Sequence, residues 1–288
     1  TRKFYLAGII PVAGQPLDFN MPWHDCLMPI APDYHAIERA VLECAYAGCK
    51  TIWIVANDDT TPLVRHRIGD YVEDPVYLRR MGKYPRQKRQ QRSVFYVPVS
   101  VKHKSREWCI SWTIIHGAKT AHSITSELSK WTAAKNFYVS FPSSVYPPDF
   151  IREHRRDIRK EENFLFNFEE KSILKGNKLG FTFSEKQMNH ALDLFQKEHG
   201  AFFDEKEDER EYYFNNFSLD KVFGQTMAEE SMKIEIPWYY SLDGWESYCN
   251  YLSSEERKEI KHPGKLVISY REYSPIGRDV EKVLDEED

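Results

Sequence analysis

The sequence predicts an α/β fold: a mixed, mainly parallel sheet with helices on both faces, followed by a C-terminal α+β elaboration. Residues 4–11 (FYLAGIIP) and 50–56 (KTIWIVA) are continuous apolar runs, typical of strands that are covered on both faces. The helix-like segment between them is the crossover that two parallel strands require. Small residues follow the first run, and loops at that end of such strands bind ligands.

The crossover helix is predicted over residues 33–48. Asp33 is placed to cap its amino end, and Gly48 stands where a left-handed glycine commonly ends a helix. Glu38 and Arg39 fall on its other face. Its apolar residues recur at three- and four-residue spacing: Ile37, Ala40, Val41, Cys44 and Ala45.

The elements after the second strand are shorter. Residues 93–101 and 136–141 are predicted strands, and Pro98 suggests a sheet edge or a bulge in the first of them. Residues 108–115 (WCISWTII) are a further strand candidate, which leads into a loop at Gly117 and then a helix.

The second half mixes charged and aromatic segments. A charged helix is predicted over residues 148–162, and another helix follows Ser184, which forms a capping box with Gln187. Residues 233–240 and 265–270 read as strands. We therefore predict an α/β core over residues 1–150 and a C-terminal part over residues 151–288 that completes the sheet and adds a helical, aromatic-rich extension.

Composition narrows the class of protein. A chain of 288 residues can bury a large core, and its net charge of −4 gives no general reason to expect nucleic-acid binding. Its five cysteines form no CxxC pair or zinc-site spacing, which favours reduced thiols in an intracellular compartment. No apolar run approaches the roughly 18 residues of a membrane span. These features predict a soluble, cytoplasmic protein.

Three local patterns have competing interpretations. Residues 79–92 carry seven cations among fourteen residues and could hold phosphates or nucleic acid, although a solvated loop is the favoured interpretation. His24, Asp25 and Cys26 could suggest a metal site or a catalytic triad, but adjacent residues rarely converge on one atom, which favours a structural or surface role. The Gly117–Thr120 run (GAKT) lacks the glycine spacing of a phosphate-binding P-loop. His116 and His122 flank that run and are weaker candidates for phosphate contacts.

One ordered set of motifs resembles a known family. Residues 9–15 (IIPVAGQ), Pro22 and residues 27–30 (LMPI), followed by the helix and the strand to residue 57, look like the sugar-1-phosphate nucleotidyltransferases. This family includes the UDP-glucose and dTDP-glucose pyrophosphorylases. Residues 238–248 (WYYSLDGWESY) are similar to a late family segment in which an aspartate lies near a helix start.

The resemblance implies a Rossmann-like sheet of the glycosyltransferase-A type. It implies a reaction that joins a nucleoside triphosphate to a sugar phosphate and releases pyrophosphate, with Mg²⁺ held by aspartates. The phosphate-holding loop would be Ala13, Gly14 and Gln15, and the wall beside the base would include Gly117 and Ala118. Asp243 would be a metal ligand, although a helix N-cap is the alternative role for it.

The sequence departs from the family pattern at three positions that carry charge. The loop after Gly14 has no arginine, Trp23 replaces a lysine, and Ser143 and Ser144 stand where a strand should end in a metal-binding aspartate. Arg65, Arg67 or the 79–92 run could replace a lost cation. No catalytic residue can be assigned from the sequence.

Two functions from different classes therefore remain open. The first is a divergent nucleotidyltransferase, or a relative that transfers sugar from a nucleotide donor. The second is a non-catalytic descendant of the fold that acts as a binding or assembly module, for example in a virus particle. Its aromatic C-terminal half would then contact a partner or a second copy of the chain. Fold resemblance alone does not decide between them.

Overall fold

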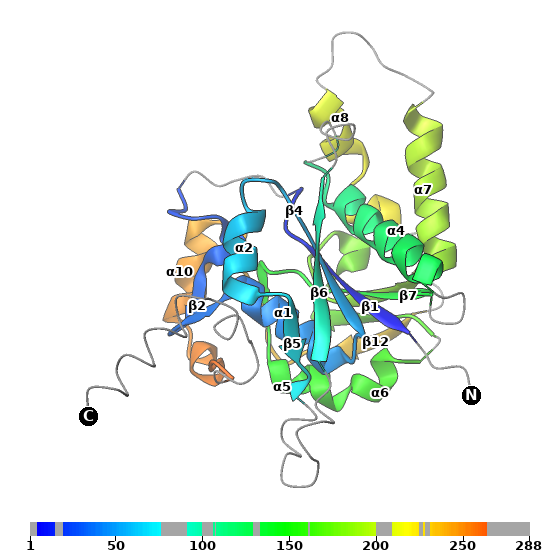
Figure 1. Ribbon diagram of the computed structural model, residues 1–288. Coiled ribbons are helices and arrows are strands. Elements are labelled where there is room, and N and C mark those ends of the chain that lie inside the picture. The colour runs from blue at the N-terminus through cyan, green and yellow to red at the C-terminus, as the bar shows by residue number, and fades with distance from the viewer. Residues whose placement is uncertain are drawn as a thin grey trace, which may run out of the picture.

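A nine-stranded sheet organises the chain in the computed structural model (Figure 1). Its strands follow the order β10-β9-β11-β7-β1-β4-β6-β5, and β12 pairs with β9. The structure describes residues 5–14, 20–75, 91–99, 106, 108–128, 133–160, 162–199, 209–224, 227 and 231–263.

The centre of the sheet is parallel, as predicted. β1 (Leu6–Pro11) lies between β4 (Thr51–Ala56) and β7 (Asn136–Val139), and β4 is followed by β6 (Gln91–Pro98). The chain fills one side of β1 first and then crosses to the other side to form β7. The carboxyl end of β1 is therefore the topological switch point, where open α/β sheets bind their ligands.

Antiparallel strands extend both sides of this centre. β5 (Tyr71–Glu73) pairs with β6, and β11 (Phe181–Ser184) pairs with β7. β11 in turn pairs with β9 (Phe164–Phe168), which is flanked by β10 (Lys171–Ser172) and by the parallel strand β12 (Met232–Glu235). The second half of the chain thus completes the sheet.

Pro98 lies at the end of an internal strand. β6 runs between β4 and β5, so it is not an edge strand of the sheet, although Pro98 itself lies beyond the end of β5. Pro98 pairs with Ala56 at the last position of the ladder, whereas β5 reaches only as far as Ser93. Its missing N–H therefore faces no strand on the β5 side.

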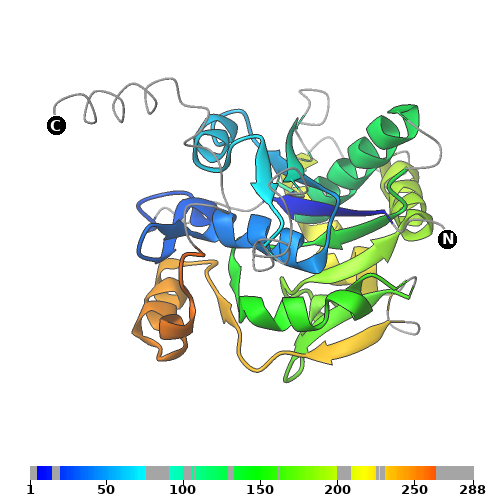
Figure 2. The same cartoon turned by 60° about the horizontal axis from the view of Figure 1, so that its bottom comes forward.

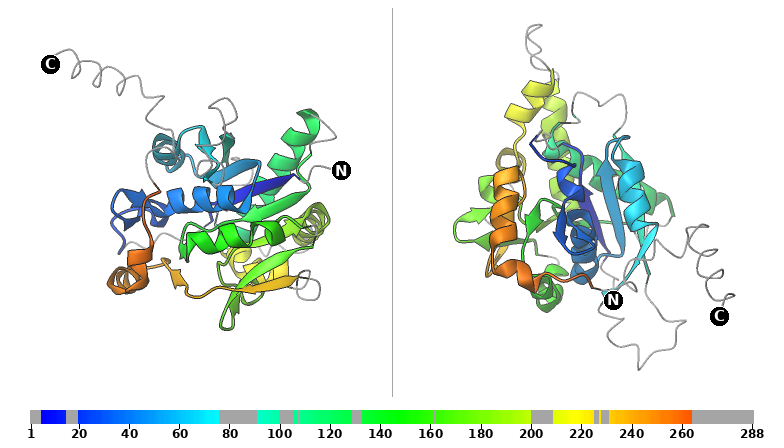
Figure 3. Two further views of the ribbon diagram at one scale, coloured as in Figure 1. Left: turned by 90° about the horizontal axis from the view of Figure 1, so that it is seen from below. Right: turned by 90° about the vertical axis from the view of Figure 1, so that its left-hand side faces the viewer.

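Helices cover both faces, and each face has its own apolar core (Figures 2 and 3). One face carries α1 (Ala36–Ala47), α2 (Thr61–Ile68), α5 (Pro148–Glu153), α6 (Arg155–Ile158) and α10 (Trp245–Ser253). The other carries α4 (Ile110–Leu128), α7 (Glu185–His199), α8 (Glu209–Asn216) and a π-helical turn (Asp220–Gly224). None of the described helices is long and apolar enough to cross a membrane.

Short elements complete the architecture. They are β2 (Pro29–Ala31) paired with β3 (Tyr34–His35), β8 (Ser144–Val145) paired with β13 (Tyr240–Ser241), and 3-10 turns at Asp25–Leu27, Ile173–Lys175 and Glu256–Glu259. The helix predicted over residues 148–162 is the pair of short helices α5 and α6. The predicted strand 265–270 lies outside the described residues.

The crossover helix begins later than predicted. Asp33 is not its cap, because Asp33 occupies the turn between β2 and β3 with a positive φ of 54°. The N-cap is His35, whose N–H donates to the Glu38 carboxylate at 2.8 Å. Gly48 ends the helix in the left-handed conformation, at φ 90°, as predicted.

The strand predicted at residues 108–115 is wrong, because this segment opens the long helix α4. Ile114, Ile115 and Ala118 are fully buried and recur at helical spacing against the sheet. Gly117 is likewise inside the helix and not in a loop. A Cβ at that position would lie 2.7 Å from Val55 Cγ2, so the glycine lets the helix lie close to β4.

Candidate functional site

The carboxyl end of β1 turns directly toward β4. The N–H groups of Val12 and Ala13 both donate to the carbonyl of Val55, at 2.9 Å each. These amides are therefore used inside the sheet and do not face a phosphate. The nucleotide contact predicted for Ala13 stays a prediction, and Gln15 lies outside the described residues.

Gly14 brings this turn against the amino end of α4. It adopts φ 85°, and a Cβ there would lie 2.8 Å from Cys109 C, Ile110 N and Thr113 Oγ1. Only glycine tolerates both the conformation and the contact. The first N–H groups of a long helix attract anions, because they lack partners within the helix and lie at the positive end of its dipole.

Three buried oxygens around this edge have no hydrogen-bond partner among the described residues. Ser111 Oγ lies in the first turn of α4, Asn57 Oδ1 follows β4, and Ser143 Oγ follows β7. An unsatisfied buried polar group costs about 1–3 kcal/mol, so such oxygens suit contact with a ligand's donors. Sequence reasoning missed Ser111, because it assigned this segment to a strand.

Asp243 reaches the same edge but already has partners. The N–H of Leu242 donates to the carbonyl of Ser143 at 2.6 Å, which places Asp243 beside the end of β7. Its carboxylate pairs with the Lys178 ammonium and accepts from Ser241 Oγ at 2.6 Å. The N-cap of α10 is Gly244, so the alternative role for Asp243 is wrong. Its role as a metal ligand stays a prediction.

Gly117 and Ala118 lie away from this edge. Both are buried two turns into α4, where Gly117 faces the side chains of Val55 and Ile9. The loop in which they were expected is wrong, and the structure gives both residues a packing role. Their contact with a nucleotide base is a prediction that this geometry does not favour.

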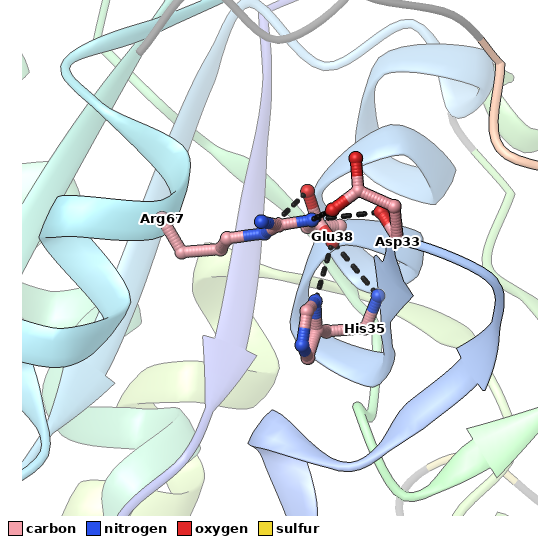
Figure 4. A network of polar contacts seen from close by, with 4 residues as sticks. All are labelled: Asp33, His35, Glu38 and Arg67. Atoms are coloured by element: carbon pink, nitrogen blue, oxygen red, sulfur yellow. Dashed lines mark hydrogen bonds and ion pairs between the residues drawn. The ribbon is translucent and has the colours of Figure 1, made fainter. Parts of the chain in front are cut away.

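Arg65 and Arg67, the suggested replacement cations, are both paired. Arg65 forms an exposed ion pair with Asp70 at 3.0 Å. Arg67 joins α2 to α1 through Glu38 at 3.0 Å and Asp33 at 2.9 Å (Figure 4). Burial alone would lower the pKa of Arg67, but Asp33 and Glu38 outweigh that effect and raise it. Residues 79–90 lie outside the described residues.

Arg106 is a buried cation just before α4 that the sequence did not point to. Its carbonyl accepts from Cys109 N–H at 3.0 Å, within the segment that contacts Gly14. Its guanidinium lies 4.6 Å from the ring centre of Trp112 and 5.0 Å from that of Tyr213. These cation–π contacts attach the segment before α4 to α8.

A buried polar network connects α1 to the end of β7. Arg39 donates to Glu43 and to the carbonyl of Phe141, each at 2.6 Å, and Ser140 Oγ donates to Glu43 at 2.7 Å. The hydroxyls of Tyr138 and Tyr146 donate to the other oxygen of Glu43. Arg39 and Glu43 are almost fully buried. Glu38 is buried as well, although Glu38 and Arg39 were predicted on the face of the helix opposite its apolar residues.

Ionisation within this network is strongly biased. Burial, reinforced by the charge of Glu43, raises the pKa of both tyrosine hydroxyls well above the ordinary value. Burial would lower the pKa of Arg39, but the Glu43 carboxylate reverses the shift and raises it. The network therefore holds one buried ion pair and two neutral hydroxyls, a rigid support for the residues after β7.

His24, Asp25 and Cys26 lie close together, as a metal site would require. Their ligand atoms fall within 4.8 Å of one another. However, His24 Nδ1 and Asp25 Oδ1 are 2.6 Å apart, and both accept the Cys26 N–H. Burial, with the charge of Asp25, raises the pKa of the Cys26 thiol well above its usual value, which disfavours the thiolate a metal needs. The geometry supports the favoured structural role.

His116 and His122 bond to the protein. His116 Nε2 lies 3.3 Å from the carbonyl of Pro98, and His122 Nδ1 lies 2.8 Å from that of Ala134. Burial lowers the pKa of His116, so its neutral form is favoured. Neither geometry indicates a phosphate contact.

Comparisons with known proteins show the fold. No family model and no curated protein matches the sequence. A glucose-1-phosphate thymidylyltransferase from Bacillus anthracis, in complex with sucrose, is 12% identical over 91% of this chain and 98% of its own, with a TM-score of 0.56. UDP-glucose pyrophosphorylase complexed with UDP-glucose is 13% identical over 88% of this chain and 99% of its own, with a TM-score of 0.55. The apo form of a UDP-glucose pyrophosphorylase is 11% identical over 89% and 100%, with a TM-score of 0.52.

Proposed function

We propose that this chain binds a nucleoside triphosphate at the carboxyl edge of β1 and joins it to a sugar phosphate, releasing pyrophosphate. The likeness to a thymidylyltransferase and to a pyrophosphorylase seen with UDP-glucose supports this proposal at the level of the fold. The observation that carries it is the Gly14 turn, which lies against the first turn of α4 at the topological switch point.

In this proposal the amino end of α4 receives the phosphates. The dipole of the helix favours negative charge at this end, and a glycine at position 14 lets the preceding turn approach without a side chain. The backbone N–H groups of Ser111 and Trp112 already bond to the Cys109 side chain. Ser111 and Asn57 offer buried oxygens to donors on the nucleotide. Gln15 is proposed as a further contact from the same loop.

The residues present do not fit a protein-held Mg²⁺. Mg²⁺ prefers carboxylate oxygens. Of the two positions that the resemblance gives to metal-binding aspartates, one holds serine and the other, Asp243, is paired with Lys178. We infer that the Lys178 ammonium supplies positive charge at this edge.

The same pairing favours a second function, a non-catalytic binding module of this fold. Transition-state charge in nucleotidyl transfer needs preorganised cations, and removing one such donor costs on the order of 2.7–4 kcal/mol. A chain that keeps the turn but has lost the loop arginine and one aspartate could bind a nucleotide without turning it over. Such a module would act through a partner or a second copy of the chain.

The binding step is tested by calorimetric titration with each of the four nucleoside triphosphates. We expect saturable binding of at least one of them to the unaltered chain. Gly14→Ala should weaken this binding at least about tenfold, since its Cβ must push the turn away from α4. The matched control is Gly48→Ala, at the carboxyl end of α1. Gly48 has a similar φ of 90°, but a Cβ there would contact only flexible arginine side chains.

Two outcomes would decide against parts of this proposal. If all four titrations are silent, the nucleotide site is wrong. If a triphosphate binds but no pyrophosphate appears with any hexose 1-phosphate supplied, the chain is a binding module and not a transferase. If Gly14→Ala and Gly48→Ala weaken nucleotide binding equally, the effect comes from general backbone strain and not from the Gly14 turn.

A further inference from the structure

Four cationic side chains gather at the amino-terminal edge of the sheet, opposite the carboxyl edge described above. We call them the amino-edge cluster: Lys50 before β4, Arg92 at the start of β6, Arg155 in α6 and Arg159 just after it. In Figure 1 this edge lies at the bottom, near β5, α5 and α6.

Two members of the cluster share one buried carboxylate. Asp74 accepts from Arg92 at 2.8 Å and from Arg155 at 2.7 Å, and its side chain is fully buried. Arg155 also donates to the carbonyls of Ala45 and Tyr46, the last turn of α1. This part of the cluster is satisfied and ties α6 to α1 and the sheet.

The other two members have no partner among the described residues. Neither the Lys50 ammonium nor the Arg159 guanidinium forms a hydrogen bond or an ion pair there, and Arg159 Nε is a buried donor with no acceptor. Arg159 lies beside Arg155: a Cβ on Gly48 would be 2.8 Å from Arg159 Cδ and 3.1 Å from Arg155 Nε. Burial and then the charges of Arg92 and Arg159 lower the pKa of Lys50. Positive charge is thus crowded here.

Two other carboxylates of the described residues lie close in the chain to this cluster, and neither forms an ion pair with Lys50 or Arg159. Glu73 follows Val72, which pairs with Arg92, so strand alternation places Glu73 on the opposite face. Asp157 is 2.7 Å from Lys160 and 3.4 Å from His154. Among the described residues, Asp74 is thus the carboxylate that pairs with this cluster of four cations, and it pairs with two of them. This excess of positive charge favours an anion with more than one charge.

We propose that the amino-edge cluster binds a phosphate dianion, either inorganic phosphate or a terminal phosphoryl group. The buried N–H of Arg159 and the ammonium of Lys50 are its donors, and Arg92 and Arg155 add positive charge. Arginine favours phosphate because its planar fork matches the tetrahedral oxygens. This site is separate from the proposed nucleotide site, since α1 runs from one edge to the other between them.

The test is a titration of the full chain with inorganic phosphate at constant ionic strength, followed by calorimetry and by thermal unfolding. The unaltered chain should show saturable binding and a phosphate-dependent rise in Tm. Lys50→Gln and Arg159→Gln should each weaken binding at least about tenfold, because each removes a charged donor. Arg156→Gln is the matched control: it removes an exposed arginine of the same helix and should change binding by less than about twofold.

The unfolding temperature without phosphate is a second measurement, which tests the proposal even if a variant folds poorly. Without phosphate, Lys50→Gln should unfold at the same or a higher temperature than the unaltered chain, because it relieves repulsion. Phosphate that raises Tm no more than chloride does would overturn the proposal, as would equal weakening in Arg156→Gln. Gly14→Ala should keep phosphate binding here, so failure of this site and failure of the nucleotide site give different results.

Discussion

Glu43 shows how much a single buried side chain organises in this protein. Its carboxylate receives Arg39, Ser140, Tyr138 and Tyr146, and so connects α1 to β7 and to the segment after β7. Amphipathic periodicity cannot reveal such a residue, since its three hydroxyl partners lie 95 to 103 positions away in the chain. The burial of Arg39, which was predicted on the face opposite the apolar residues, could not be foreseen for the same reason.

Replacing Glu43 with glutamine should therefore be costly. The variant leaves the Arg39 guanidinium buried without its counter-charge, and we expect the free energy of unfolding to fall by about 3–5 kcal/mol. Tyr138→Phe removes one hydrogen bond to the carboxylate and should cost about 1.5–3 kcal/mol. Denaturant unfolding measures both. A Glu43→Gln loss below that of Tyr138→Phe would contradict the ion-pair account.

At the scale of elements, the sequence predicted those whose local and tertiary signals agree. β1, β4 and the crossover helix were predictable from long apolar runs and from Gly48 at the helix end. α4 was not, because tryptophan, isoleucine and threonine at its start favour strands locally, and only packing against the sheet selects the helix. Parts of the site could not be predicted for the same reason. The position of Ser111 and the pairing of Asp243 with Lys178 depend on contacts between elements far apart in the sequence.

The substitution Gly117→Ala tests how closely α4 packs on the sheet. Gly117→Ala gains about 1 kcal/mol of helix propensity. Its Cβ, however, would lie 2.7 Å from Val55 Cγ2 and 3.1 Å from Ile9 Cγ2, and overpacking of this kind costs about 1–3 kcal/mol. We expect a net loss in thermal stability. Ser123→Ala, an exposed position on the same helix, should stay within about 0.5 kcal/mol of the unaltered chain.

For the whole molecule, one sheet joins both halves of the chain. β7 from the first half is bonded to β1 on one side and to β11 from the second half on the other. Residues 1–150 alone would leave β7 as an unprotected edge. We expect the full chain to unfold in a single cooperative transition by circular dichroism, and the fragment to show none. A cooperative transition in the fragment would mean that the first half is an independent domain.

The place of β12 has a consequence for synthesis in the cell. This strand runs parallel to β9, although its residue Met232 lies 68 positions after its partner Phe164 in the chain. Parallel strands cannot be joined by a hairpin, so a long crossover connects them. A ribosome must therefore release residue 235 before the flank of β9 is covered. Until then the backbone edge of β9, whose five residues include three phenylalanines, lacks its β12 partner, and a chaperone would be expected to shield it during translation.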